Sequence, residues 1–169
     1  FPYTTLFRSE TTAAATGAVG VVRRDPMAMR PFCGYNMGDY FGHWLEMGEK
    51  LGENAPKIFN VNWFRTDDEG NFIWPGFGDN MRVLMWILDR CEGKADAVET
   101  AIGYEPKPED INIEGLDIDV DTVKELLNVD ENLWKEEAKG IREFYKQFGD
   151  RLPKELADEL DALEARLNK

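Results

Sequence analysis

Histidine and cysteine, the residues that most often bind transition metals or act as catalytic bases and nucleophiles, are scarce in this chain. His43 is the only histidine, and the two cysteines, Cys33 and Cys91, lie far apart in the sequence. No Cys-x-x-Cys pair and no cysteine–histidine cluster occurs, so the sequence predicts neither a zinc site nor a disulfide framework. His43 has no marked nucleophile partner, so no serine or cysteine triad is indicated. Cysteines without a pairing pattern are typical of a reducing compartment, and we expect a cytoplasmic protein.

Long apolar runs and clusters of basic residues are also missing. No stretch approaches the ~20 consecutive apolar residues of a membrane-spanning helix. The formal net charge is −13, and residues 96–169 carry 21 of the 33 acidic side chains but only 10 of the 20 basic ones. Binding to nucleic-acid phosphates requires clustered lysine and arginine, so an acidic surface argues against it. We therefore expect neither a membrane nor a nucleic acid as partner, and interpret the acidic half as solvated helix faces.

Two familiar ligand motifs are absent as well. The sequence has no Gly-x-x-x-x-Gly-Lys-Ser/Thr phosphate-binding loop. The acidic run Asp-Ile-Asp-Val-Asp at 117–121 resembles the start of a calcium loop, but Thr122 and Asn128 stand where an EF-hand needs glycine and glutamate. These acids are therefore predicted to begin a helix.

The N-terminal half combines strand-like and helix-like patterns. Residues 19–23 are rich in valine, and residues 60–65 alternate along the chain, so both are predicted to be strands. A turn at 67–70 is predicted to return the chain in a hairpin. Asn36 is placed to cap one helix, and residues 81–91 have the apolar pattern of another.

Beyond residue 96 the pattern becomes mostly helical. Two stripes of apolar residues at helical spacing predict packed helices. The first stripe is Leu133, Trp134, Ala138, Ile141, Phe144, Tyr145 and Phe148, and the second is Leu156, Leu160, Leu163 and Leu167. With 169 residues, of which 43% are apolar, the chain has the size of one domain. We expect an α/β fold with an incomplete mixed sheet and a helical C-terminus.

An aromatic loop with two glycines, Trp-Pro-Gly-Phe-Gly-Asp-Asn at 74–80, is the most informative segment. Phe77 lies between glycines, which let a ligand approach the backbone closely. Asn80 stands at the start of a predicted helix, where N–H groups face outward. Phe64 and Phe72 precede the loop. Aromatic faces stack on flat rings, and an asparagine amide offers both a donor and an acceptor, so this set predicts a purine site.

The same aromatic residues have a second interpretation. Clustered aromatic side chains usually form core, and the loop would then be a tight turn packed on a partner surface. The protein would be a noncatalytic interaction module. Exposure distinguishes the two, because a ligand site leaves the faces of Phe64 and Phe77 open and a core buries them.

The loop, together with Arg-Pro-Phe-Cys-Gly-Tyr-Asn-Met-Gly at 30–38, closely resembles GTP-dependent phosphoenolpyruvate carboxykinase. The resemblance runs from about Ser9 to the C-terminus and covers only the C-terminal part of that longer enzyme. It implies that residues 9–169 form the C-terminal portion of the P-loop-containing, GTP-binding catalytic domain. Residues 1–8 depart from the family pattern and are predicted to be a non-native or truncated leader.

The resemblance also implies a reaction and a set of site residues. The family interconverts oxaloacetate and phosphoenolpyruvate with carbon dioxide, a gluconeogenic reaction that uses GTP, with Mn²⁺ at the active site and Mg²⁺ on the nucleotide. Matching positions assign the guanine of GTP or GDP to a set of six residues. They are Phe64, Phe72, Phe77, Gly78, Asp79 and Asn80, with Asp79 standing where relatives often have glutamate.

The resemblance further implies a lid over the active site. Its Ser-Glu-x-Thr-Ala-Ala-Ala pattern corresponds to Ser9, Glu10, Thr11, Thr12, Ala13, Ala14 and Ala15, with Thr11 at the variable position. The P-loop, the metal-binding residues and the main substrate-binding arginines of the family have no counterpart in this sequence. We therefore assign no catalytic or metal-binding residue here. The parent is expected to be a monomeric enzyme, and this chain is expected to be inactive alone.

Overall fold

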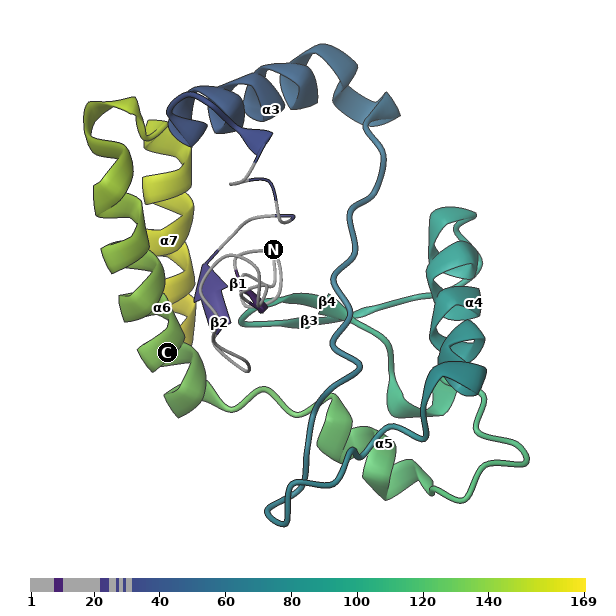
Figure 1. The fold of residues 1–169 in the computed structure, drawn as a ribbon. Coiled ribbons are helices and arrows are strands. Elements are labelled where there is room, and N and C mark those ends of the chain that lie inside the picture. The colour runs from purple at the N-terminus through teal and green to yellow at the C-terminus, as the bar shows by residue number, and fades with distance from the viewer. Residues whose placement is uncertain (1–7, 11–21, 25–26, 28, 30–31) are drawn as a thin grey trace. The chain divides into compact units, whose positions relative to one another are not determined.

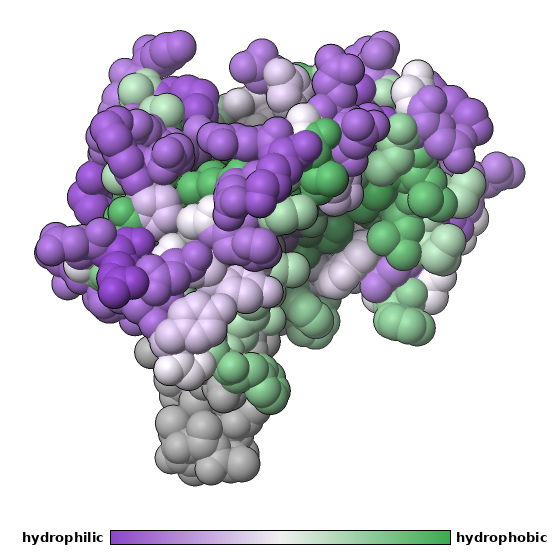
Figure 2. Space-filling view, turned by 90° about the horizontal axis from the view of Figure 1, so that it is seen from above, coloured by the Kyte–Doolittle hydropathy of each residue, from purple (hydrophilic) through white to green (hydrophobic). Residues whose placement is uncertain are grey.

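Residues 8–10, 22–24, 27, 29 and 32–169 are described by the computed structural model of the chain, which divides into two units (Figure 1). One unit is Val61–Asp130. The other combines the described residues before Val61 with Glu131–Lys169. Hydrophilic side chains cover much of the face seen in Figure 2, and groups of hydrophobic residues remain visible between them. Among the described residues, no helix is both long and apolar enough to cross a membrane.

The unit built from both ends of the chain is mainly helical. Its helices are α3 (Met37–Leu51), η3 (Gly52–Asn54), α6 (Glu131–Tyr145), η6 (Lys146–Arg151) and α7 (Lys154–Leu167). Helices α6 and α7 lie side by side (Figure 1). Most of the two predicted stripes is buried, including Ala138, Ile141, Phe144, Tyr145, Phe148, Leu160, Leu163 and Leu167. Leu133 is an exception, because it lies in the first turn of α6 and is exposed.

Asn36 caps α3 as predicted and also ties this helix to η6. Its side-chain oxygen accepts from the amide of Gly38 at 2.8 Å, and its Nδ2 donates to the backbone oxygen of Phe148 at 3.1 Å. A Cβ on Gly38 would lie 2.3 Å from the backbone oxygen of Arg151, so only glycine fits this contact. Arg151 in turn donates to the carboxylate of Asp39 at 2.8 Å.

This unit also contains a short antiparallel strand pair. β1 (Arg8–Glu10) pairs with β2 (Val22–Arg24), with Ser9 opposite Arg23. The strand predicted at 19–23 is thus confirmed at its C-terminal end, and residues 19–21 lie outside the described part of the chain. β1 itself was not predicted.

The unit Val61–Asp130 begins with an extended segment and continues through short elements. These are η4 (Phe77–Asp79), α4 (Asn80–Cys91), β3 (Val98–Thr100), β4 (Gly103–Glu105), η5 (Pro108–Asp110) and α5 (Val120–Leu126). The predicted helix 81–91 is confirmed to within one residue. Asp119 caps α5 by accepting from the amide of Thr122 at 2.8 Å, which confirms that the acidic run begins a helix. Trp74, Trp86, Ile102, Ile111 and Val123 are the buried hydrophobic residues of this unit.

The strand predicted at 60–65 does not form, although its alternation is present. Val61, Trp63 and Arg65 are partly buried, and the residues between them are exposed. Instead of joining a ladder, the amide of Phe64 donates to the side chain of Asn62 at 3.0 Å. Asparagine side chains compete with neighbouring strands for backbone groups in this way. Pairing in this region is limited to one antiparallel bridge, between Thr66 and Phe72.

The α/β character predicted from the sequence is present, but the described strands do not form a mixed sheet. They form two separate antiparallel pairs, β1–β2 and β3–β4. A mixed sheet requires parallel neighbours, which are joined by long crossover connections. The strands of each pair here are neighbours in chain order.

Candidate functional site

Asp67 organises the hairpin that carries Phe64 and Phe72. Its backbone oxygen accepts from the amide of Gly70 at 3.1 Å, and its carboxylate accepts from the amide of Asn71 at 2.8 Å. Gly70 has a φ of 86°, a conformation that favours glycine. The hydrogen bonds from Asn71 hold the pKa of the Asp67 carboxyl below its usual range, so this turn is held by a charged acceptor. The predicted hairpin turn is therefore confirmed.

The hairpin places two phenylalanine rings together on an open surface. The ring centroids of Phe64 and Phe72 are 5.9 Å apart at an interplanar angle of 61°, an edge-to-face arrangement. Phe64 is 70% exposed and Phe72 is 65% exposed. Core aromatics do not retain this much accessible surface. The pair can therefore present an aromatic face to a flat ligand.

The loop before α4 exposes a third ring. Gly76 has a φ of 126°, which only glycine adopts without strain, and it begins the η4 turn that carries Phe77. Phe77 is 91% exposed. A Cβ on Gly78 would meet nothing within 4 Å, so the backbone beside this ring is open to a ligand. The conformation of the loop thus holds Phe77 out in solvent.

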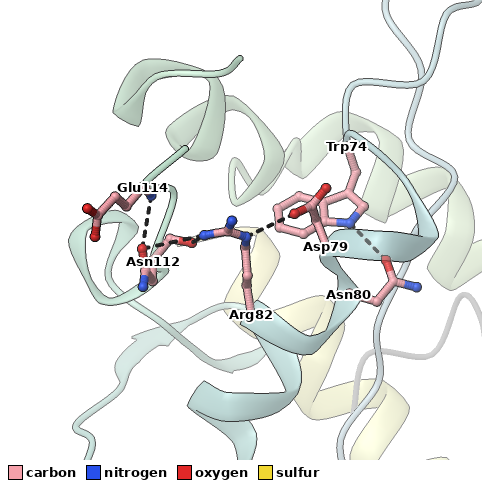
Figure 3. A network of polar contacts seen from close by, with 6 residues as sticks. All are labelled: Trp74, Asp79, Asn80, Arg82, Asn112 and Glu114. Atoms are coloured by element: carbon pink, nitrogen blue, oxygen red, sulfur yellow. Dashed lines mark hydrogen bonds and ion pairs between the residues drawn. The ribbon is translucent and has the colours of Figure 1, made fainter. Parts of the chain in front are cut away.

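Asn80 is the first residue of α4, and its side chain is bound to the loop. The indole Nε1 of Trp74 donates to the Oδ1 of Asn80 at 2.9 Å (Figure 3). Trp74 is buried, so this hydrogen bond is partly shielded from water. The sequence predicted that Asn80 would offer a ligand both an acceptor and a donor. One of the two lone pairs of the amide oxygen is used within the protein, and the predicted contact with a ligand stays a prediction.

Asp79 and Arg82 brace the same turn. Arg82 Nε donates to the Asp79 carboxylate at 3.0 Å, and its Nη1 donates to the backbone oxygen of Asn112 at 2.8 Å (Figure 3). The Asn112 side chain accepts from the amide of Glu114 at 2.9 Å. The Asp79 side chain therefore holds η4 against the 112–114 loop through Arg82.

Two residues outside the six that the sequence analysis assigned to the site thus position this part of the molecule. Trp74 and Arg82 hold Asn80 and Asp79 through side-chain contacts. The three-residue spacing of Asp79 and Arg82 on a helical turn is a signal that could have indicated their ion pair. The contact between Trp74 and Asn80 spans a loop of irregular backbone, and no sequence spacing indicates it.

The predicted lid is described only at its start. Ser9 and Glu10 lie in β1, where Glu10 is opposite Val22. Thr11, Thr12, Ala13, Ala14 and Ala15 lie outside the described residues. The lid assignment therefore stays a prediction.

A partly buried carboxyl group lies near the base of the hairpin. Burial raises the pKa of Glu105 to about 7, and the charge of Arg65 acts in the opposite direction. Arg65 donates to the backbone oxygens of Leu126 and Asn128 at 3.0 and 3.2 Å.

Within the described part of the chain, no group of three or more histidine, cysteine, aspartate or glutamate residues could hold a metal ion.

The chain matches one protein family over nearly its whole length. The profile described as "Phosphoenolpyruvate carboxykinase C-terminal P-loop domain" matches residues 3–166. This match begins inside the segment 1–8 that was predicted to be a non-native or truncated leader, and that prediction stays untested.

Individual relatives agree with the profile. The proteins named "Phosphoenolpyruvate carboxykinase [GTP]" are 60% identical over 163 residues in Treponema pallidum strain Nichols, 57% over 160 residues in Renibacterium salmoninarum and 53% over 161 residues in Neocallimastix frontalis. These alignments cover 94–95% of this chain and 26% of each relative. The chain spans about a quarter of the length of these relatives. The resemblance found in its motifs is confirmed: the chain belongs to the GTP-type phosphoenolpyruvate carboxykinase family and matches the profile of that family's C-terminal P-loop domain.

Proposed function

We propose that this chain carries the guanine-binding part of an enzyme that converts oxaloacetate to phosphoenolpyruvate and carbon dioxide with GTP. The observation that supports it most is the exposure of three phenylalanine rings, Phe64, Phe72 and Phe77, in a unit that also holds Asn80 at a helix start. The interpretation of these aromatics as core requires them to be buried. Their exposure therefore favours the ligand site over the noncatalytic module.

Each residue of the proposed site has a distinct role. Phe77 and the pair Phe64–Phe72 supply aromatic faces for a base, and stacking of this kind contributes about 1–3 kcal/mol per base. Asn80 donates to the base edge. Gly78 leaves room for close approach, and Asp79 holds the turn through Arg82.

The chemical step lies outside this chain in the proposal. Mn²⁺ and Mg²⁺ would neutralise and position phosphate oxygens in the whole enzyme, and the described residues offer them no cluster of ligands. We propose that Ser9, Glu10 and residues 11–15 close over the reacting groups as a lid. The isolated chain would then bind a guanine nucleotide weakly and catalyse no decarboxylation.

The test uses a completed enzyme, in which this chain is joined to the preceding segment of the Treponema pallidum relative. Replacing Phe77 with alanine should weaken GDP binding by about 1–3 kcal/mol, measured by calorimetry. It should leave the unfolding free energy within about 0.5 kcal/mol, because the ring is exposed.

Tyr104→Ala is the matched control, since Tyr104 is an exposed aromatic of the same unit on β4. It should leave GDP affinity unchanged. Equal affinities for the parent and the Phe77→Ala variant would reject the site. A large loss of stability in that variant would restore the interpretation of Phe77 as core.

A further inference from the structure

The contact between Trp74 and Asn80 determines which way the Asn80 amide faces. The oxygen and nitrogen of an asparagine amide have nearly the same shape, so their assignment depends on hydrogen-bond partners. An indole Nε1–H can only donate, and so its partner must be the amide oxygen. The 2.9 Å contact is therefore made by Oδ1, and Figure 3 shows Nδ2 pointing away from Trp74.

The indole of Trp74 is held in one position, so it can determine the orientation of the Asn80 amide. It is 6% exposed, and its ring packs against Trp63 with centroids 6.2 Å apart. Turning the amide over would bring its NH₂ group against the indole N–H, two donors with no acceptor between them. A shielded donor without a partner is costly, and the flipped orientation is therefore disfavoured.

We propose that Trp74 is a positioning residue that sets base selectivity, because it fixes the Asn80 amide with the donor group Nδ2 turned away from the indole and toward a ligand. This inference rests on the proposed guanine site. A purine with a carbonyl oxygen at position six, such as guanine or hypoxanthine, accepts from these donors. Adenine has an amino group there, so two donors would face each other. Selectivity follows from the unfavourable contact as much as from the favourable one.

The first experiment removes the indole donor and keeps an aromatic ring. In the completed enzyme, Trp74→Phe should lower the preference for GDP over ADP roughly tenfold, because one hydrogen bond no longer fixes the amide. IDP should behave like GDP, since it keeps the oxygen at position six. Trp63→Phe is the control, because it alters the same aromatic pair without touching Asn80, and it should keep the parent's preference.

The second experiment leaves the packing of Trp74 intact, and so does not depend on whether Trp74→Phe folds. Asn80→Asp keeps an acceptor for the indole but replaces the outward donors with a carboxylate oxygen. It should weaken GDP and IDP and strengthen ADP, which shifts the preference by more than tenfold.

A double variant separates this inference from the site proposal itself. If Trp74 acts through Asn80, adding Trp74→Phe to Asn80→Ala changes the base preference no further. If Asn80→Ala lowers the preference and Trp74→Phe does not, the positioning role is rejected and the guanine site stands. If neither variant alters the preference or the GDP affinity, both the inference and the placement of Asn80 in the site are rejected.

Discussion

Paired phenylalanine rings are buried in one unit of this chain and exposed in the other. In the helical unit, Phe41, Phe144 and Phe148 are at least 93% buried, and Phe148 lies edge-on to both of the others with centroids 5.4 and 5.1 Å away. In the unit Val61–Asp130, Phe64 and Phe72 meet in a similar edge-on geometry at 5.9 Å, but both remain mostly exposed. The ring pairing is alike, and only the surroundings differ.

The difference lies in the backbone that carries the rings. Phe41 and Phe144 stand on helices, and Phe148 stands on the η6 turn that follows α6, so their side chains converge on one apolar interior. Phe64 and Phe72 lie on a hairpin that joins no larger sheet. A single hairpin has no apolar layer to cover its rings. The exposed rings of Phe64 and Phe72 therefore contribute less to stability than the buried rings of the helical unit do.

The largest expected effect is in the buried cluster. Phe148→Ala should lower the unfolding free energy by about 3–5 kcal/mol, because it removes a ring that contacts Phe41 and Phe144 and leaves a cavity. Chemical denaturation of the chain, followed by circular dichroism, measures this loss. Leu133→Ala on the exposed side of α6 is the control and should change stability by less than about 0.5 kcal/mol. Equal losses of unfolding free energy in the two variants would contradict this prediction, because Phe148 would then behave as a surface residue.

In the exposed pair Phe64–Phe72, a substitution should affect ligand binding at least as much as stability. Phe72→Ala in the completed enzyme should weaken GDP binding by about 1 kcal/mol, while the unfolding free energy falls by no more than about 1 kcal/mol from the lost ring contact with Phe64. Phe72→Leu sharpens the test, because it restores apolar bulk without an aromatic face. It should recover stability more than affinity. If it recovers both equally, Phe72 contributes packing and not stacking.

The smallest effect concerns the partly buried carboxyl group of Glu105 and depends on pH. The pKa of Glu105 rises from 4.5 to about 7 on folding, so the folded state prefers the protonated carboxyl. Its contribution to stability is fully present below pH 4.5 and is lost as the pH rises through about 7. Glu105→Gln should therefore exceed the parent in stability at pH 8, by on the order of 1 kcal/mol after allowing for solvent screening, and match it more closely at pH 5.

Asp67→Asn is the control for that measurement, because folding lowers the pKa of Asp67 and raises the pKa of Glu105. The pKa of Asp67 is lowered by its hydrogen bonds from Asn71, so its contribution is present at neutral pH and lost as the pH falls. Asp67→Asn should therefore be less stable than the parent at neutral pH, and this deficit should shrink on acidification. A Glu105→Gln variant that is likewise less stable than the parent at pH 8 would show that Glu105 is paired rather than desolvated.

The sequence by itself determined the features that depend on neighbouring residues. The cap at Asn36, the turn at Asp67 and the start of α4 all follow from contacts within about four positions, and each is present as predicted. The apolar stripes of α6 and α7 likewise follow from helical periodicity. Family membership also comes from sequence alone, because the motifs are long and specific.

Only the tertiary structure decided the features that depend on distant partners. Whether residues 60–65 join a ladder depends on a neighbouring strand, and here Asn62 supplies the partner of the Phe64 amide. The same holds for the burial of Phe148 and the exposure of Phe77, which have identical side chains. The orientation of the Asn80 amide also depends on a contact that the sequence does not indicate. It is fixed by an indole that reaches across an irregular loop, because directional hydrogen bonds depend on where atoms lie in space and not on their order in the chain.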